Sequence, residues 1–248
     1  MERNITGACF SPTGGTRRAL EDLCGLFGRA ELLELGAGRQ WERTMGRNEL
    51  LILALPVYAG QIPAVPGLLD GLRGEETPCV LAAAYGNRHY DNALAQMKKE
   101  MNARGFRCAA GAAVVTPHVF APTLGAGRPD EADLEVLAAF ARQVEEKLSR
   151  PDWEEAQLPG DPNPPPKPAV PVEKDRDWDI CLGCGFCAQV CPTGAMDRQT
   201  LLWDKAKCIS CMACVSRCPV GALGYNASAL ASRLTQLFSQ RRPVETFL

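Results

Sequence analysis

The chain has 248 residues, 46% of them hydrophobic, and a formal net charge of −2 at pH 7. This length and apolar content fit one or two globular domains with a sizeable core. The sequence pI of about 5.8, without a basic stripe, excludes a nucleic-acid-binding surface from the expected functions.

The chain carries no recognisable export or membrane signal. Its first residues, MERNITGACF, lack the basic flank and long apolar stretch of a signal peptide. The longest apolar run, Leu50–Leu55 continuing into Val57, is far too short to cross a bilayer. We therefore expect a cytoplasmic protein without a membrane span.

Short apolar runs alternate with helical patterns through the first 150 residues. Strands are predicted over Ile5–Phe10, Ala30–Leu35, Leu50–Leu55, Cys79–Tyr85 and Cys108–Val115. Helices are predicted over Thr16–Phe27, Pro63–Leu72, Asp91–Ala103 and Pro129–Leu148, and residues 36–48 should hold a further crossover. Such alternation predicts an α/β domain whose parallel sheet is covered on both faces, and five strands suggest the doubly wound order 2-1-3-4-5.

A turn rich in glycine and hydroxyl groups joins the first strand to the first helix. Its candidate ligands for a phosphate are Ser11, Thr13, Gly14, Gly15 and Thr16. Backbone N–H groups and the positive end of the helix dipole attract phosphate there, and the hydroxyls add donors. The turn lacks the spacings typical of nucleoside triphosphate and dinucleotide loops. A simple helix cap at Thr16 explains the turn about equally well.

Two further loops leave the third and fourth predicted strands at the same edge of the sheet, where ligands of open α/β sheets bind. Their candidate residues are Pro56, Tyr58, Ala59, Gly60, Tyr85, Gly86, Asn87 and Tyr90. Tyr58 and Tyr90 can stack on a flat ring, and Asn87 can meet its polar edge. Packing explains any single tyrosine as well, but the three loops together favour a flavin pocket.

A proline-rich stretch separates this region from the rest of the chain. Residues 159–171 contain seven prolines in thirteen positions, which favours extended polyproline geometry. At about 3.1 Å per residue the stretch can span roughly 40 Å. An inert spacer and a strap that holds two modules at a fixed approach are equally good interpretations.

Eight cysteines after this stretch form an internal repeat. Each half reads C-x2-C-x2-C-x3-C-P, and the second copy follows 27 residues after the first. This spacing is typical of bacterial ferredoxins with two [4Fe–4S] clusters, in which the fourth cysteine of each run binds the other cluster. We assign one cluster to Cys181, Cys184, Cys187 and Cys218, and the other to Cys208, Cys211, Cys214 and Cys191. Structural zinc and disulfides are weaker interpretations.

The motifs SPTGGT, PVYAG and YGNRHYDNAL, followed by the double C-P repeat, resemble fused flavodoxin–ferredoxin proteins of anaerobic microbes. The resemblance implies a flavodoxin-like FMN-binding domain over 1–150, a linker over 151–174, a small α+β ferredoxin domain over 175–226 and a helical tail over 227–248. It also implies that Ser11–Thr16 binds the FMN phosphate, and that Tyr58 and Gly86–Tyr90 flank the isoalloxazine ring.

These features predict an electron-transfer protein that links one-electron and two-electron redox partners through FMN and two clusters. Its partners would be redox proteins bound transiently, with a small-molecule electron acceptor as a further option. Two alternatives remain open: an FMN-dependent reductase of a small organic substrate fed by its own clusters, and a flavin-free binding module with a ferredoxin tail. No nicotinamide-binding fingerprint is present.

The remaining cysteines and the two histidines have less specific contexts. Cys9, Cys24, Cys79 and Cys108 lie in apolar segments and are expected to be buried, inert thiols. His89 either faces the flavin or makes ordinary surface hydrogen bonds, and the second interpretation is the commoner one.

Overall fold

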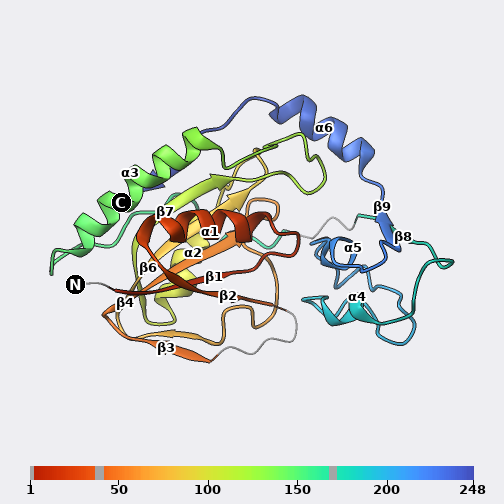
Figure 1. Ribbon diagram of the computed structural model, residues 1–248, viewed down its shortest axis with the longest axis horizontal. Helices are drawn as coiled ribbons and strands as arrows, with labels where there is room; N and C mark the ends of the chain where they lie inside the picture. The colour runs from red at the N-terminus through yellow and green to blue at the C-terminus, as the bar shows by residue number, and fades with distance from the viewer. Residues whose placement is uncertain (1–2, 37–41, 168–171) are drawn as a thin grey trace.

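The computed structural model describes residues 3–36, 42–167 and 172–248. Its N-terminal part is built around one mostly parallel sheet, and the cysteine-rich part lies beside it (Figure 1). The strands of this sheet are β1 (Asn4–Cys9), β2 (Ala30–Glu34), β4 (Glu49–Pro56), β6 (Thr77–Tyr85), β7 (Phe106–Val115) and β10 (Glu245–Phe247). Their order is β2-β1-β4-β6-β7-β10, with β10 antiparallel to β7 and the other neighbours parallel. Counted along the chain, the parallel strands therefore run 2-1-3-4-5.

Helices cover both faces of the sheet, as predicted. They are α1 (Gly15–Phe27), α2 (Ala93–Asn102) and α3 (Glu131–Leu148). In β4, Leu51 and Leu53 pack with α2, whereas Ile52 packs with α1 and α3 on the other side. This alternation follows from the period of two along a strand. Among the described residues, no helix is both long and apolar enough to span a membrane.

The predicted helix over Pro63–Leu72 is wrong. Residues 66–71 form turns, and Leu72 begins a short strand, β5 (Leu72–Gly74). This strand pairs in parallel with β3 (Arg43–Met45) as a separate two-stranded sheet. The segment contains two prolines, which disfavour a helix, and Gly67 has a φ of 70°, which a helix does not allow.

The same β3 lies in the region predicted to hold a crossover between the second and third predicted strands, residues 36–48. Residues 37–41 of that prediction lie outside the described part of the chain.

The cysteine-rich part is a small unit with two related halves. Strands β8 (Lys174–Arg176) and β9 (Leu223–Tyr225) form an antiparallel pair. Two short helices, α4 (Phe186–Gln189) and α5 (Ala213–Ser216), occupy equivalent places in the two cysteine repeats. The unit therefore combines a minimal sheet with one helical turn per repeat.

The segment that precedes this unit contacts the N-terminal part at two points. Ala156 is fully buried, and its N–H donates to the Cys108 carbonyl oxygen at 2.9 Å. Further along, the Gln61 amide donates to the Pro165 carbonyl oxygen at 2.8 Å. The described part of the proline-rich stretch thus lies on the first domain.

The segment 227–248, predicted as a helical tail, holds a helix and then a strand. Helix α6 (Ser228–Phe238) leads away from the cysteine-rich part, and β10 then joins the edge of the central sheet (Figure 1). A three-residue edge strand is too short to produce a readable alternation of apolar and polar residues, which is why the sequence did not reveal it.

Candidate functional site

The eight repeat cysteines are all free thiols, and six of them fall into two sets in the fold. One small cavity is lined by Cys191 from the first repeat together with Cys208, Cys211 and Cys214 from the second. This grouping is the one that the crossed assignment requires, because the fourth cysteine of the first run meets the first three of the second.

The other set consists of two cysteines of the first repeat that contact Arg176. Its guanidinium donates to the Cys181 sulfur at 3.3 Å and to the Cys187 sulfur at 3.6 Å. Cys184 of the same run is exposed. Among the described residues, no three side chains of His, Cys, Asp or Glu converge on one point suited to a single metal ion.

Both cysteine loops have the same backbone shape. Gly183 and Gly185 have positive φ values of 63° and 71°, and the equivalent Ser210 and Met212 have values of 52° and 60°. The second loop thus adopts the left-handed conformation without glycine, at some cost in strain. The shape aims N–H groups at sulfur: Ser210 N–H donates to the Cys208 sulfur at 3.4 Å.

The surroundings shift the pKa values of the cysteines in different directions. Burial raises the pKa of Cys211 to about 12 and that of Cys214 to about 11. The backbone N–H of Gly183 and the Arg176 guanidinium lower the pKa of Cys181. Iron would bind these cysteines as thiolates and would share their negative charge, which offsets the cost of burying them. The donor set therefore fits an iron–sulfur cluster.

The turn predicted to bind phosphate begins helix α1. Gly14 is its N-cap in the left-handed conformation, with a φ of 91°, so the alternative cap at Thr16 is not formed. Thr16 lies inside the first turn and is buried, as is Ser11, whose hydroxyl oxygen accepts the Arg17 N–H at 2.9 Å. Gly15 packs against Thr116, and Thr13 remains exposed.

The loop after β6 forms hydrogen bonds with the C-terminal segment. The Asn87 amide donates to the carbonyl oxygens of Phe238 and Gln240, at 2.6 and 2.8 Å. Tyr90 is buried, and its hydroxyl donates to Glu245 at 2.8 Å. Two of the three side chains that the sequence analysis directed at a flavin ring, Asn87 and Tyr90, therefore hold β10 and the residues before it.

The other predicted loop residues have varied surroundings. Tyr85 is buried in the core, and a side chain at Gly86 would collide with His118. Gly60 permits a close approach of Asp91. These placements give the glycines a packing role, because they let neighbouring loops approach.

The loop after β4 lies near the proline-rich stretch and the cysteine-rich part. Pro56 ends β4, and the Ala59 carbonyl oxygen accepts from Lys167 at 2.9 Å. Tyr58 is half-buried. Burial raises the pKa of Tyr58 well above its ordinary value, and the charge of Cys211 adds to the shift. The Tyr58 ring thus lies within electrostatic reach of a candidate cluster ligand.

Direct hydrogen bonds join the cysteine-rich part to the Ser11–Thr16 turn that is predicted to bind phosphate, called the phosphate turn below. The Ser216 hydroxyl donates to the Pro12 carbonyl oxygen at 3.0 Å, and the Arg217 guanidinium donates to the Ser11 carbonyl oxygen at 2.9 Å. Arg217 also pairs with Glu34. Sequence reasoning missed Arg217, because no motif marks a side chain whose partners are about 200 positions away.

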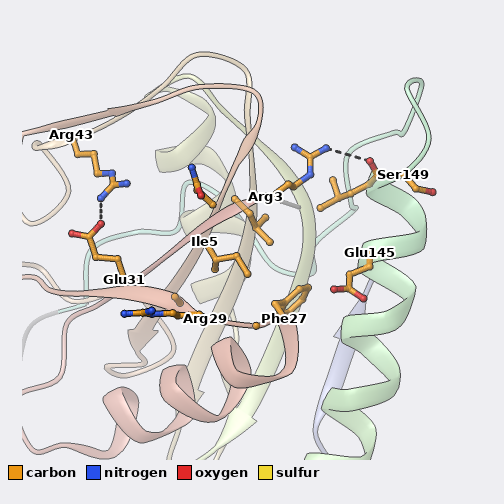
Figure 2. A pocket seen from close by; sticks show the side chains of 13 residues that line it. Arg3, Ile5, Phe27, Arg29, Glu31, Arg43, Glu145 and Ser149 are labelled. Carbon is orange, nitrogen blue, oxygen red and sulfur yellow. Dashed lines mark hydrogen bonds and ion pairs between the residues drawn. The ribbon is translucent and has the colours of Figure 1, made fainter. Parts of the chain in front are cut away.

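A separate hollow of about 1010 Å³ lies at the opposite, amino end of the sheet (Figure 2). Arg3 there donates to the Leu148 carbonyl oxygen, and Arg43 pairs with Glu31. The guanidinium groups of both arginines thus already have partners within the protein.

The remaining thiols and histidines make local contacts. Burial raises the pKa of Cys9 and of Cys24 to about 12, and Cys79 and Cys108 are also buried, as expected for inert thiols. His89 accepts the Asp91 N–H at 2.8 Å and stacks on Tyr90.

Comparison with known proteins identifies one part of the chain. Residues 174–219 match the family model of the 4Fe-4S dicluster domain, so the C-terminal part is a ferredoxin-like iron–sulfur domain. No curated protein matches the chain.

Two similar crystal structures are candidate flavoproteins from Bacteroides eggerthii DSM 20697 and Bacteroides uniformis ATCC 8492. They are 14% and 11% identical to this chain and cover 57% of it, with 98% and 99% of their own lengths aligned. Both TM-scores are 0.41.

Proposed function

We propose that the protein is an electron-transfer iron–sulfur flavoprotein, with FMN in a flavodoxin-like N-terminal domain and two [4Fe–4S] clusters in the C-terminal domain. The observation that carries the proposal is the crossed grouping of the cysteines, in which Cys191 lines one cavity with Cys208, Cys211 and Cys214. A single cluster would bind only four of the eight repeat cysteines.

The residues of this chain would hold each group in a distinct way. Cys181, Cys184, Cys187 and Cys218 bind the first cluster, and Cys208, Cys211, Cys214 and Cys191 bind the second. The Ser11–Thr16 turn receives the FMN phosphate at the start of α1, where Thr13 is exposed and able to donate. The loop at Tyr58–Gly60 contacts the ring. When bound, the clusters supply single electrons and the flavin supplies two-electron exchange.

The contacts between domains support an order for the cofactors. Arg217 and Ser216, which follow Cys214 in the chain, bind the Ser11 and Pro12 carbonyl oxygens. The charge of Cys211, which lines the cavity with Cys191, Cys208 and Cys214, acts on Tyr58, so this cavity lies on the side of Tyr58. We assign the second cluster to the flavin side and the first to the exchange of electrons with other proteins.

The exposed side of the first cluster fits a transient redox partner. Cys184 is exposed, and two apolar side chains shortly before it in the sequence are 59% exposed at Trp178 and 68% exposed at Leu182. Redox partners bind through small, short-lived interfaces, for which such a surface is sufficient.

Anaerobic purification followed by measurement of iron, sulfide and flavin tests the proposal. We expect about eight iron atoms and one FMN per chain, since each cluster contains four irons. Zinc in place of iron, or protein without any flavin after purification and reconstitution with FMN, would contradict the corresponding half of the assignment.

A further inference from the structure

Strand β8 places two cations on one side of the sheet that it forms with β9. Its three residues are Lys174, Asp175 and Arg176. Because successive side chains of a strand point to opposite faces, the first and third share one face and Asp175 points away. Asp175 is exposed, whereas Lys174 is buried and Arg176 is half-buried.

Lys174 is directed at the second set of cysteines. It lines the same cavity as Cys191, Cys208, Cys211 and Cys214. Its ammonium donates to the Cys208 sulfur at 3.2 Å and lies 5.7 Å from the centre of the Trp203 ring.

Arg176 has the equivalent relation to the first set. Its guanidinium donates to the sulfurs of Cys181 and Cys187. It also donates to the Leu201 carbonyl oxygen at 2.8 Å and lies over the Trp178 ring at 5.1 Å. One strand therefore gives each half of the cysteine repeat its own positive group.

The burial of Lys174 is the informative part of this arrangement. Lys174 is only 7% exposed, and besides the Cys208 sulfur its ammonium donates to the neutral Val172 carbonyl oxygen at 3.4 Å. A buried ammonium needs a negative partner, since removing its charge from water without one is costly. The thiolates of a bound cluster supply that negative charge.

We propose that β8 sets the reduction potentials of the two clusters separately, Lys174 for the second cluster and Arg176 for the first. This inference rests on the proposed function. A cation that donates to a cluster thiolate stabilises the reduced, more negative cluster and so raises its potential. The effect of Lys174 is the larger one, because its buried charge is screened less by water than that of Arg176.

The test is a redox titration of the holo-protein, followed by electron paramagnetic resonance, for Lys174→Met and Arg176→Met. Lys174→Met should make reduction of the second cluster about tenfold less favourable, which is a negative shift of about 59 mV for a one-electron couple. Arg176→Met should shift the first cluster in the same direction by less. Each variant should leave the other cluster nearly unchanged.

Lys174→Arg keeps the charge and should restore most of the potential. Lys205→Met is the matched control, because its ammonium pairs with Glu173 at the surface and is 57% exposed. Equal shifts of both clusters, or no shift with Lys174→Met, would overturn the inference. Iron that is absent from the wild-type protein would instead overturn the proposed function.

If Lys174→Met does not assemble its clusters, a measurement on the wild-type protein can still test the role of Lys174. Protein labelled with ¹⁵N only in lysine should show a nitrogen coupling to one reduced cluster in pulsed electron paramagnetic resonance. Lys205→Met should keep this coupling, and Lys174→Arg should abolish it. Wild-type protein with intact clusters and no such coupling would refute the role of Lys174.

Discussion

In the proposed assignment, Cys191 and Cys218 each bind the cluster of the other repeat. Cys191 lines the cavity of the second set. The Cys218 sulfur accepts the Ala222 N–H at 3.3 Å, next to β9. These two positions decide whether the repeats form two independent loops or one interlocked unit.

We predict that Cys218→Ala damages the cluster of Cys181, Cys184 and Cys187 and leaves the other one assembled. The reason is that the fourth thiolate of each cluster comes from the distant repeat. Electron paramagnetic resonance of the reduced variant, with Cys191→Ala as the reciprocal control, distinguishes the two clusters. Loss of the cluster of Cys208 in the Cys218 variant would reverse the ligand assignment.

A second prediction concerns the phosphate turn. Thr13→Ala should weaken FMN binding by about fivefold to tenfold, in line with the roughly 1–1.5 kcal/mol of one hydrogen bond. Thr44→Ala removes the same group from an exposed position on β3 and should have no effect. Fluorescence titration of the flavin measures both affinities. An unchanged affinity for Thr13→Ala would remove this hydroxyl from the site.

At this scale the sequence was informative about side chains that lie in a motif and silent about those that act from a distance. The cysteine spacing revealed all eight candidate ligands. Lys174, Arg176 and Arg217 have no motif, because their partners are brought close only by folding. Asn87 and Tyr90 satisfied the pattern of a ring-binding loop, yet both bind the C-terminal segment.

Among the elements, the long periodic ones were predictable and the short ones were not. Helix α3 begins at Glu131, where Asp130 and Asp133 form a capping box, and the sequence pattern indicated this start within two residues. The strands β3, β5 and β10 have three residues each, and their pairing depends on neighbours far along the chain. The segment Pro63–Leu72 combines apolar residues with prolines and glycines, and it forms turns in place of the predicted helix.

The start of α3 also anchors the C-terminal segment through an ion pair that responds to pH. Arg241 donates to both carboxylate oxygens of Asp130, at 2.6 and 2.9 Å. This pairing holds the pKa of Asp130 well below its usual range. A carboxyl whose pKa is lowered by folding stabilises the fold above its unfolded pKa of about 3.9 and loses that effect as the pH falls through the folded value.

We therefore predict that pepsin cuts the segment after α6 increasingly as the pH falls below about 4. In Asp130→Asn, pepsin should already cut this segment faster than in the wild-type protein above a pH of about 4, and the cleavage rate should increase less as the pH falls. Arg233→Ala, an exposed change on α6, is the control. Equal acid dependence in Asp130→Asn and wild type would show that this ion pair does not hold the segment.

At the scale of the whole molecule, Arg217 is the clearest link between the two domains. It contacts the Ser11 and Pro12 carbonyl oxygens and pairs with Glu34. We predict that Arg217→Ala keeps its full content of iron and flavin but transfers electrons between domains at least several-fold more slowly. The carbonyls of the phosphate turn would lose their donor, and the two domains would be held less closely.

Flash-induced reduction of the flavin, followed by the absorbance of the clusters, measures this rate. Arg233→Ala serves again as a control, because its side chain is exposed on α6. An unchanged rate in Arg217→Ala would mean that the contact at Ser11 and Pro12 does not determine the distance between the cofactors.

The pairing of β10 with β7 changes how the cysteine-rich part is attached. Because Glu245–Phe247 lies beside Gly111–Ala113, the chain enters this part from the first domain and returns to it. The cysteine-rich part is thus an insertion in the first domain, and the chain on each side of it is attached to that domain. One proteolytic nick between residues 159 and 167 should leave both fragments in a single particle on size-exclusion chromatography, and release should require a second cut beyond α6.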